Sequence, residues 1–460
     1  MSGRSAHDYV TRLLVVGGGP AGHAAATEAA ALGAHVTLVE DQILGGAAHL
    51  WDCIPSKAMV ASMSRLTAIR RATQLGITDN LAPAAIDMVG LAEHVASITN
   101  TLARGFSDML ELQDVVVHRG RGRFTGQHTA AVADAEGGVT ALSFDHALIS
   151  TGSRPFVPSW APVDGERVVT TREAYSFDTM PEHIVIVGSG VTGVEMVHIF
   201  ASLGSRVTLL VSRHHLLPYR DAEVAAVLEE DFLARGVTLL KGSRANSIIR
   251  EGDVVRVSTE DGRTVEGSHC LLAVGSLPNT EDLGLGVAGV EVDGGYVKVD
   301  ENQRTSVPHI FAAGDVTGQM PLSSVAQMQG TKVARLVLGQ VVKPLDYGKI
   351  AQAVFTDPEI ASVGLEEVDA AAEGRKVRIT KVPFAANPKA LMTANTVGFA
   401  KVISDPATHI VLGGTVVGKN ASELIAPLAL AVTARVRVDM LFETLMVHPS
   451  LSEVISEAAE

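Results

Sequence analysis

Two stretches of the chain repeat one pattern of apolar and polar positions. Residues 12–40 and 183–211 each begin with a short apolar run, pass through a glycine-rich turn into a segment rich in alanine or valine, and end in a second apolar run. A continuous apolar run beside a turn is typical of a buried parallel strand, and the segment between the runs has the length of a helix. The pattern predicts strand, turn, helix and strand in each stretch, with Gly33 and Gly204 placed to end the helices.

The glycines of the two turns keep the same spacing. Gly17, Gly19 and Gly22 in the first stretch correspond to Gly188, Gly190 and Gly193 in the second. Between a strand and a helix, the first glycine allows the tight turn, the second lets a pyrophosphate approach the backbone, and the third lets helix and strand pack closely. The helix N-terminus adds the positive end of its dipole. The sequence therefore predicts two bound dinucleotides, and passing electrons from one to the other is a natural reason to bind both.

The two copies differ where the ribose of the nucleotide is recognised. Glu40 ends the second strand of the first copy, where a carboxylate accepts hydrogen bonds from ribose hydroxyls. The second copy has Val211 at this place, followed by Ser212 and Arg213. A carboxylate would repel a 2′-phosphate, so its absence beside a cation and a hydroxyl favours NADPH or tolerance of both nucleotides.

Composition narrows the choice of partners. The chain has 460 residues and a net charge of −14, and only 4% of its residues are aromatic. An acidic surface repels phosphate backbones and anionic lipids, which argues against nucleic-acid and membrane-surface binding. No apolar stretch approaches the roughly 20 residues of a membrane span, and the first apolar run lacks signal-peptide architecture. We expect a cytoplasmic protein with reduced thiols.

Further motifs resemble those of one known family. Gly45–Lys57, with the sequence GGAAHLWDCIPSK, resembles the active-site helix of the flavoprotein disulfide reductases, the family of lipoamide dehydrogenase and glutathione reductase. Five more segments resemble motifs of this family in the same order along the chain: Ser150–Pro155, Ala273–Thr280, Thr305–Asp315, Phe355–Ile360 and His448–Glu453. Ser276 stands where the family usually has arginine.

The resemblance implies an α/β fold with two Rossmann-like dinucleotide-binding domains, one for FAD and one for NAD(P)H, and an α+β dimerisation domain at the C-terminus. The FAD-binding domain would cover 8–155 and 276–345, the NAD(P)-binding domain 156–275, and the dimerisation domain 346–460. In the last domain we expect strands near 353–355, 399–403 and 410–417, then helices from Glu423 and from Met440. The active unit would be a homodimer in which each flavin site is completed by the other chain.

The resemblance also assigns residues to both cofactors. FAD would contact Gly17, Gly19, Gly22, Glu40, Gly46, Lys57, Gly122, Thr151, Gly152, Asp315, Ser323 and Ala326. NADPH or NADH would contact Gly188, Gly190, Gly193, Glu195, Ser212, Arg213 and Gly275. Lys57 and Glu195 would form an ion pair beside the flavin, where a cation stabilises the electron-rich reduced ring.

The chain departs from the family at its pair of thiols. Cys53 keeps the flavin-proximal position, but Ala48 occupies the position of the thiol that attacks the substrate. The only other cysteine, Cys270, falls in an apolar run that predicts a buried strand. Thiol–disulfide exchange needs a resolving thiol, so electrons would reach the flavin but would not continue to a disulfide by the family's usual route. We therefore expect an NAD(P)H:quinone oxidoreductase, as in a similar bacterial subgroup that has G-G-A-A in place of G-G-x-C.

His448 and Glu453 bear on proton delivery. In the family the histidine moves the proton of the thiol pair, and the glutamate holds the histidine. Quinone reduction takes up protons, so His448 is a candidate general acid with Glu453 as its partner, and a residual structural pair is the other interpretation. Cys53 is equally open as a charge-transfer thiolate, a redox sensor or an inert remnant.

Three other functions stay open. A soluble transhydrogenase-like flavoprotein would move hydride between NADPH and NAD, although that group lacks the other active-site cysteine. A single-cysteine disulfide reductase would use Cys53 through a small-thiol adduct. A non-catalytic flavin subunit or redox sensor would not need the contact between nicotinamide and flavin that Lys57 and Glu195 imply. None of these hypotheses includes a metal site.

Overall fold

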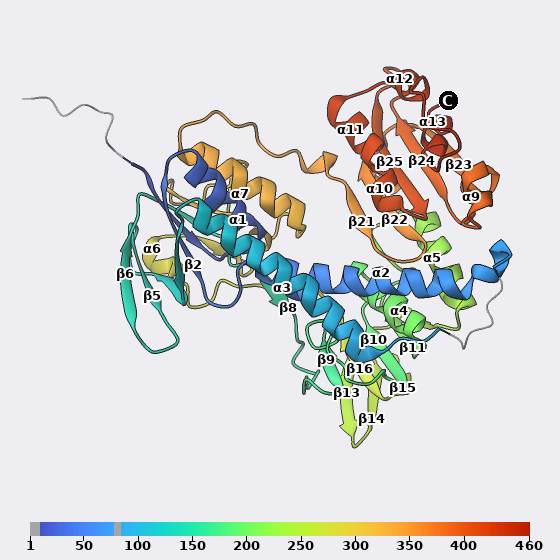
Figure 1. Ribbon diagram of the computed structural model, residues 1–460, viewed down its shortest axis with the longest axis horizontal. Coiled ribbons are helices and arrows are strands. Elements are labelled where there is room, and N and C mark those ends of the chain that lie inside the picture. Colours follow the sequence, from blue (N-terminus) through green and yellow to red (C-terminus); the bar gives the residue numbers. More distant parts are fainter. Residues whose placement is uncertain (1–9, 78–83) are drawn as a thin grey trace, which may run out of the picture. The chain divides into compact units, whose positions relative to one another are not determined.

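The structure is a computed structural model that describes residues 10–77 and 84–460. Contacts divide the chain into two compact units, and Figure 1 labels many of their elements. The first unit runs to Pro55 and continues over His94–Phe156 and Gly275–Leu345, and the second comprises Ser56–Glu93, Val157–Val274 and Asp346–Glu460. The division into FAD, NAD(P) and dimerisation domains by residue number stays a prediction.

A parallel sheet of five strands, in the order β20-β7-β1-β2-β3, forms the centre of the first unit. The strands are β1 (Arg12–Val16), β2 (His35–Glu40), β3 (Val116–Arg119), β7 (His146–Ile149) and β20 (Ile310–Ala312). Successive side chains of β1 enter two cores: Leu13 and Val15 pack with residues of α1 (Pro20–Ala31) and α7 (Ser323–Val337), and Leu14 and Val16 pack on the other face. Burial on both faces explains why this strand is a continuous apolar run.

The other face of this sheet is covered by a small antiparallel sheet of β4 (Arg121–Phe124), β5 (Thr129–Ala133) and β6 (Val139–Ser143). On the helical face, α1 and α7 approach closely because Gly330 has no side chain: a Cβ there would lie 2.0 Å from the carbonyl oxygen of Ala21. Smaller elements of this unit are β8 (Ser153–Pro155), β17 (Ser276–Pro278), α6 (Leu285–Ala288), β18 (Val292–Asp293), β19 (Tyr296–Val297) and η3 (Asp315–Thr317).

The second unit contains another parallel sheet, in the order β12-β11-β10-β16-β9. Its strands are β9 (Val168–Thr170), β10 (His183–Val187), β11 (Arg206–Val211), β12 (Thr238–Lys241) and β16 (His269–Leu272). Helices α4 (Val191–Leu203) and α5 (Ala222–Ala234) and the antiparallel strands β13 (Ala245–Glu251), β14 (Val254–Thr259) and β15 (Thr264–Gly267) belong to the same unit. The apolar faces of β10 and β16 meet β14 in one core.

The C-terminal part of the second unit is an antiparallel sheet in the order β21-β22-β25-β24-β23. Its strands are β21 (Gln352–Val354), β22 (Glu359–Gly364), β23 (Arg378–Pro383), β24 (Phe399–Ser404) and β25 (Val411–Gly418). It carries η4 (Tyr347–Lys349), α8 (Glu367–Ala372), η5 (Phe384–Ala386), α9 (Pro388–Met392), α10 (Ala421–Leu424), α11 (Ala426–Ala434), α12 (Val438–Phe442) and α13 (Glu453–Glu457). Residues of α11 and α13 share a core with β24 and β25.

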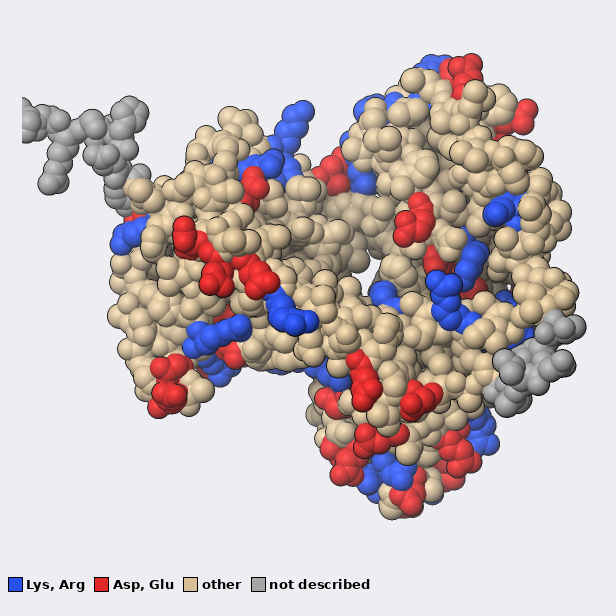
Figure 2. All heavy atoms as spheres, in the orientation of Figure 1, with Lys and Arg blue, Asp and Glu red and all other residues tan. Residues whose placement is uncertain are grey.

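Three elements lie at or next to the points in the sequence where the chain passes from one unit to the other. They are the π-helical turn η1 (Ala48–Asp52), α2 (Cys53–Arg70) and α3 (Met88–Leu112), with η2 (Ala72–Leu75) after α2. No helix within the described ranges is long and apolar enough to cross a membrane. On the face visible in Figure 2, acidic side chains are interspersed with basic ones.

The predicted repeat is confirmed, since β1-α1-β2 and β10-α4-β11 have the same order, and Gly204 ends α4 in the left-handed conformation. Three points of the prediction need correction. The segment 45–57 is not one regular helix, because it passes from η1 into α2. Strands β22 and β23 were not predicted, and the helices expected from Glu423 and Met440 begin at Ala421 and Val438.

Candidate functional site

The first and third glycines of each turn are required by the protein's own backbone. Gly17 has a φ of +103°, and a Cβ on it would lie 2.4 Å from the carbonyl oxygen of Ser150. A Cβ on Gly22 would lie 1.9 Å from the carbonyl oxygen of Gly17. The second copy repeats both restrictions, with Gly188 at φ +113° and a Cβ on Gly193 placed 1.8 Å from the Gly188 oxygen. These glycines therefore fix the tight turn and the close approach of helix to strand.

The middle glycine of each turn has no such restriction. Gly19 and Gly190 have φ values of −70° and −74°, which any residue adopts. A Cβ on Gly19 would make only one ordinary contact, at 3.9 Å, and a Cβ on Gly190 would meet nothing within 4 Å. Each turn therefore leaves open the space that a pyrophosphate would need against the backbone, beside the N-terminus of a helix. This geometry fits a dinucleotide in both copies.

Glu40 holds the first turn in place. Its Oε2 accepts a hydrogen bond of 2.7 Å from Gly18 N, and its Oε1 accepts bonds of 2.8 Å and 3.1 Å from the amides of Gln42 and Ile43. Burial raises the pKa of the Glu40 carboxyl, and these three donors oppose that rise. The carboxylate lies at the end of β2, as the sequence predicts, and a ribose contact stays a prediction.

Asp315 lies at the start of η3, at the carboxyl edge of the first parallel sheet. Its Oδ2 accepts a 2.7 Å hydrogen bond from the Ser153 hydroxyl, and burial raises the pKa of its carboxyl. Thr151 Oγ1 donates to the Asn279 carbonyl oxygen at 2.6 Å, and the Asn279 amide donates to the Thr151 carbonyl oxygen at 2.9 Å. The two motifs that flank the central insertion are thus joined to each other. Gly152, at φ +67°, has open space where its Cβ would be.

Of the remaining residues predicted to contact FAD, some lie where a cofactor could bind, and one is explained by packing within the protein. Ser323 and Ala326 lie in the first turn of α7, a fifteen-residue helix that presents its N-terminal amides here. A Cβ on Gly46 would lie 2.5 Å from Gly19 Cα, so the active-site segment packs directly on the first glycine turn. Gly122 is explained by packing instead, because a Cβ would lie 3.1 Å from a methyl of Val39.

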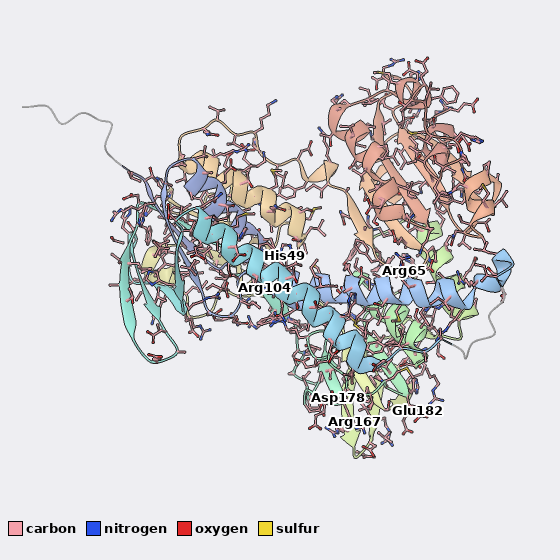
Figure 3. All side chains as sticks on the ribbon, viewed as in Figure 1. His49, Arg65, Arg104, Arg167, Asp178 and Glu182 are labelled. Carbon is pink, nitrogen blue, oxygen red and sulfur yellow. The ribbon has the colours of Figure 1, made fainter. Side chains whose placement is uncertain are left out.

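The active-site segment begins with a single π-helical turn. The Cys53 N–H donates to the Ala48 carbonyl oxygen, so these two residues stand one turn apart. His49, labelled in Figure 3, contacts two elements. Its Nε2 lies 2.8 Å from Ser323 Oγ, and its ring stacks on Phe106 of α3 at 5.2 Å between centroids. Burial lowers the pKa of His49, which favours a neutral ring. A π turn at this place is consistent with a functional site.

The second cysteine is unsuited to replace the missing thiol. Cys270 lies in the centre of β16 and is fully buried, as the sequence predicts. Both cysteines are thiols in the structure. Burial raises the pKa of the Cys270 thiol far above its usual range, and the thiol form is neither nucleophile nor ligand.

Lys57 and Glu195 form the predicted ion pair, within the second unit. Lys57 Nζ lies 2.8 Å from Glu195 Oε2, and Glu195 is almost wholly buried in α4, two residues after Gly193. The other carboxylate oxygen, Oε1, accepts a 2.9 Å hydrogen bond from Phe355 N. The Lys57 ammonium also lies 5.0 Å from the centre of the Phe355 ring. The ammonium group is therefore held in one place on a partly exposed helix.

The end of β11 is open to solvent. Val211 is buried, whereas Ser212 and Arg213 are exposed and follow it directly. The carbonyl oxygens of Val211 and Arg213 both accept from Gly242 N, at 2.8 Å and 3.2 Å, which fixes the backbone but leaves the arginine side chain available. Gly275, which was predicted with this group, belongs to the first unit and has a φ of +110°.

His448 and Glu453 form the predicted contact near the C-terminus. His448 Nδ1 lies 2.7 Å from Glu453 Oε1, and the imidazole is largely exposed. The Ser450 amide and then His448 lower the pKa of the Glu453 carboxyl. Nδ1 is thereby oriented, and Nε2 is left to face solvent or another molecule.

Sequence reasoning missed the partners of these side chains. Ser153, which donates to Asp315, and Phe355, whose amide donates to Glu195, both lie inside motifs of the family. Only the fold shows that these residues are partners. The contact between His49 and Ser323 joins positions 274 apart in sequence. Hydrophobic periodicity carries no signal for contacts of that kind.

Comparison with known proteins identifies the family to which the chain belongs. The sequence pattern of the pyridine nucleotide-disulphide oxidoreductases matches residues 11–330, and that of their dimerisation domain matches residues 350–459. The chain belongs to this family of flavoproteins. Its fold therefore comprises two dinucleotide-binding domains and a C-terminal dimerisation domain, and its cofactors are FAD and NAD(P)H.

Individual relatives match 98% of the chain. It is 42% identical to the NAD(P)H dehydrogenase (quinone) of Mycobacterium tuberculosis H37Rv, over 98% of this chain and 93% of that protein. It is 35% identical to dihydrolipoyl dehydrogenase 2 of Haloarcula marismortui, over 98% of this chain and 96% of that one. The crystal structure of LpdA from Mycobacterium tuberculosis matches with a TM-score of 0.93 and 41% identity, over 98% of this chain and 99% of that chain.

Proposed function

We propose that the chain is an NAD(P)H:quinone oxidoreductase that works without a redox-active disulfide. The main support for the proposal is that position 48, one turn from Cys53, is an alanine where a second thiol would be needed. The other cysteine, Cys270, is buried in β16. A thiol that forms a mixed disulfide must be released by another thiol. Electrons that reach the flavin must therefore leave it for an acceptor that takes them directly. The relative named NAD(P)H dehydrogenase (quinone) supports a quinone as that acceptor.

The proposed reaction converts NAD(P)H, a quinone and a proton into NAD(P)⁺ and a hydroquinone. FAD, held by the first glycine turn and Asp315, would supply the two-electron chemistry that links the nicotinamide to the quinone. Lys57, held by Glu195, supplies a fixed cation that stabilises negative charge and helps to orient the nicotinamide. His448, oriented by Glu453, supplies a proton to the quinone oxygen from Nε2.

The nucleotide is proposed to be NADPH in preference to NADH. Val211 removes the carboxylate that would repel a 2′-phosphate, and the exposed Ser212 and Arg213 offer a hydroxyl and a cation. The active unit is proposed to be a homodimer, which is what a dimerisation domain implies, with His448 serving the flavin of the other subunit. The cytoplasmic location stays a prediction from the sequence.

Anaerobic reduction followed by addition of an acceptor tests the proposal. NADPH should bleach the flavin of the purified dimer, and a naphthoquinone should restore its colour at a catalytic rate. Restoration only by oxidised lipoamide or glutathione would refute the quinone assignment, and fastest restoration by NAD⁺ would favour a transhydrogenase. A flavin that stays oxidised with both NADPH and NADH would point to a non-catalytic role. As a control, Cys53→Ser should keep its quinone turnover.

A further inference from the structure

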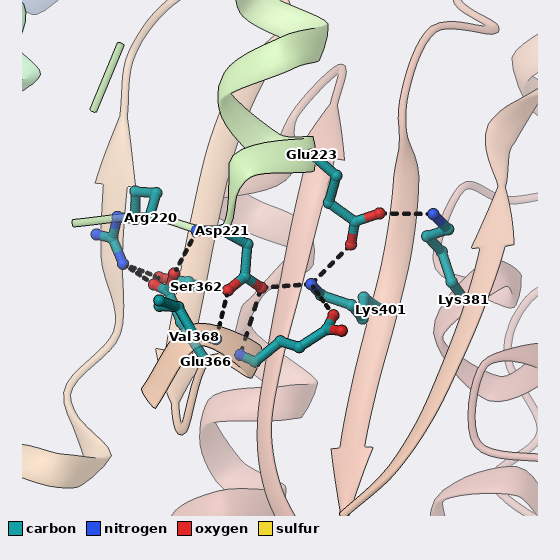
Figure 4. Close-up of polar contacts among 9 residues, drawn as sticks. Arg220, Asp221, Glu223, Ser362, Glu366, Val368, Lys381 and Lys401 are labelled. Carbon is teal, nitrogen blue, oxygen red and sulfur yellow. Dashed lines mark hydrogen bonds and ion pairs between the residues drawn. The ribbon is translucent and has the colours of Figure 1, made fainter. Parts of the chain in front are cut away.

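A lysine is fully buried between the C-terminal sheet and helix α5. Lys401 projects from β24 and is 0% exposed. Its Nζ bonds to Asp221 and lies 2.7 Å from Glu223 Oε1 and 3.3 Å from Glu367 Oε2 (Figure 4). Burial alone would lower the pKa of Lys401, but its hydrogen bonds and charge interactions with Asp221 and Glu223 raise it. The three carboxylates therefore favour the charged form of the lysine at their centre.

The three carboxylates depend on this cation. One oxygen from each lies within 4.8 Å of the others, which among the described residues is the one group with metal-ligand spacing. The ammonium group of Lys401 occupies that place. Without it, three negative charges would be left close together, and the most buried of them, on Asp221, could not turn to water.

Asp221 has an unusual position for a capping residue. It stands at the N-cap of α5, but its side chain makes no hydrogen bond to its own helix. Instead Oδ1 accepts from Val368 N at 2.9 Å and Oδ2 accepts from Glu367 N at 3.4 Å, at the start of α8. The aspartate that begins α5 therefore caps a helix of the C-terminal part. Lys401 fixes its orientation there.

The neighbouring arginine is held to the same part of the chain. Arg220 pairs with Glu366 and donates to Ser362 Oγ (Figure 4). It also donates to Gln352 Oε1 at 3.0 Å. The backbone amide of Asp221 adds a 3.3 Å bond to Glu366 Oε2. The side chains of Arg220 and Asp221, at the end of the segment 212–221, are thus both bonded to the C-terminal part of the chain.

The same segment touches the nicotinamide-nucleotide turn. Arg220 N donates to the Leu217 carbonyl oxygen at 2.9 Å, and Leu217 N donates to the carbonyl oxygen of Ser189 at 3.0 Å. Ser189 is the residue between Gly188 and Gly190. Leu217 has a φ of +48°, a left-handed conformation that its surroundings must hold. A continuous set of bonds therefore leads from Lys401 to the glycine turn.

We propose that Lys401 is a positioning residue for the nicotinamide nucleotide: by fixing Asp221 it holds the segment 212–221 against the glycine turn, and so sets the affinity for NADPH. The segment also contains Ser212 and Arg213, so both the turn and the proposed 2′-phosphate contacts depend on it. The proposal rests on the nucleotide site and not on the identity of the acceptor, so the two can fail separately.

The test is the Lys401→Met substitution in the FAD-loaded protein, with NADP⁺ titrated by calorimetry. We expect the Kd for NADP⁺ to rise about tenfold. With saturating NADPH, kcat should stay within about twofold, because the residue does not touch the reacting atoms. Hydrogen exchange at the Leu217 amide should become faster, a change that a purely local structural role would not produce.

Lys381→Met is the matched control. Lys381 also pairs with Glu223, at 2.6 Å, but it is 47% exposed and has no bond to Asp221. Exposed pairs contribute little, so its Kd should stay within about twofold of the parent value. A Lys401→Met protein with a lower unfolding midpoint and an unchanged Kd would overturn the proposal.

A second variant covers the case in which Lys401→Met does not fold. Asp221→Asn keeps an oxygen for the amides of α8 but removes the charge that Lys401 binds. We expect the Kd for NADP⁺ to rise again, by less than in Lys401→Met, and the exchange of the Leu217 amide again to become faster. An unchanged Kd together with unchanged exchange would overturn the proposal.

Discussion

The Ala48→Cys substitution tests whether one missing thiol stops electrons at the flavin. The Cys53 N–H bonds to the Ala48 carbonyl oxygen across the π turn, so the two residues are neighbours on successive turns. Side chains one turn apart on a helix are separated by roughly 5–6 Å at Cβ, and a disulfide needs Cβ atoms about 3.5–4.5 Å apart, so the turn must tighten by about 1–2 Å. A thiol at position 48 should therefore reach Cys53 and form a disulfide with small adjustments of the turn.

The quantity to measure is the number of NADPH equivalents that each subunit takes up per FAD. In the unsubstituted protein we expect FAD to take up one equivalent of NADPH, and Cys270 to add nothing, because it is buried and burial raises the pKa of its thiol. In Ala48→Cys the new disulfide takes a second equivalent, so the uptake per FAD should double. Anaerobic titration, followed by flavin absorbance and by counting accessible thiols before and after reduction, measures this directly. The variant should also reduce oxidised lipoamide at a rate that the parent lacks.

Ala47→Cys serves as the control, because it places the same thiol one residue earlier, before η1 begins. It should show the parent's single equivalent. If the parent itself accepted two equivalents, a sulfur couple would already exist and the proposed route would be wrong. If Ala48→Cys accepted only one, the turn would not bring positions 48 and 53 within bonding distance.

Three further substitutions examine other parts of the chain. Glu453→Ala should leave FAD reduction by NADPH intact and slow acceptor turnover in rapid mixing, because His448 loses its 2.7 Å partner; equal turnover would remove this pair from the mechanism. Arg213→Ala should raise the Kd for NADPH about tenfold or more while leaving NADH binding unchanged, and equal effects on both would contradict the assignment. Burial of His198 lowers its pKa to about 3, so the unfolded state binds its proton first and stability falls as the pH drops from 6.5. Urea unfolding should therefore show that the stability of the parent relative to His198→Gln decreases by about 2 kcal/mol between pH 7 and pH 5, and a constant difference would refute this.

The parts of the fold that repeat a local pattern were predictable. Each nucleotide-binding turn lies in one stretch of sequence, with strand, glycines and helix in order, so hydrophobic periodicity and glycine spacing suffice. The Lys57–Glu195 pair is different, because it joins positions 138 apart and only the resemblance to a known family suggested it.

Lys401 shows the limit of pattern reasoning. It stands in FAKVIS, a strand whose residues are all buried, although a lysine ordinarily marks the solvent face. Its partner Asp221 lies 180 positions earlier, at a helix start where an aspartate is expected to cap its own helix. The sequence contains both residues, but the reason for each is the other, and that pairing exists only in the folded chain.

A disulfide reductase that uses Cys53 alone would differ from the proposed quinone oxidoreductase in its need for added thiol. If Cys53 attacked a disulfide, one half would leave as a thiolate and the other would stay bound as a mixed disulfide. Position 48 offers a methyl group, and Cys270 is fully buried in β16, where burial raises the pKa of its thiol. Release would then require a thiol from solution, and turnover would rise with the concentration of that thiol. Direct transfer from the flavin to a quinone has no such requirement, so dependence on added thiol distinguishes a single-cysteine reductase from the oxidoreductase proposed here.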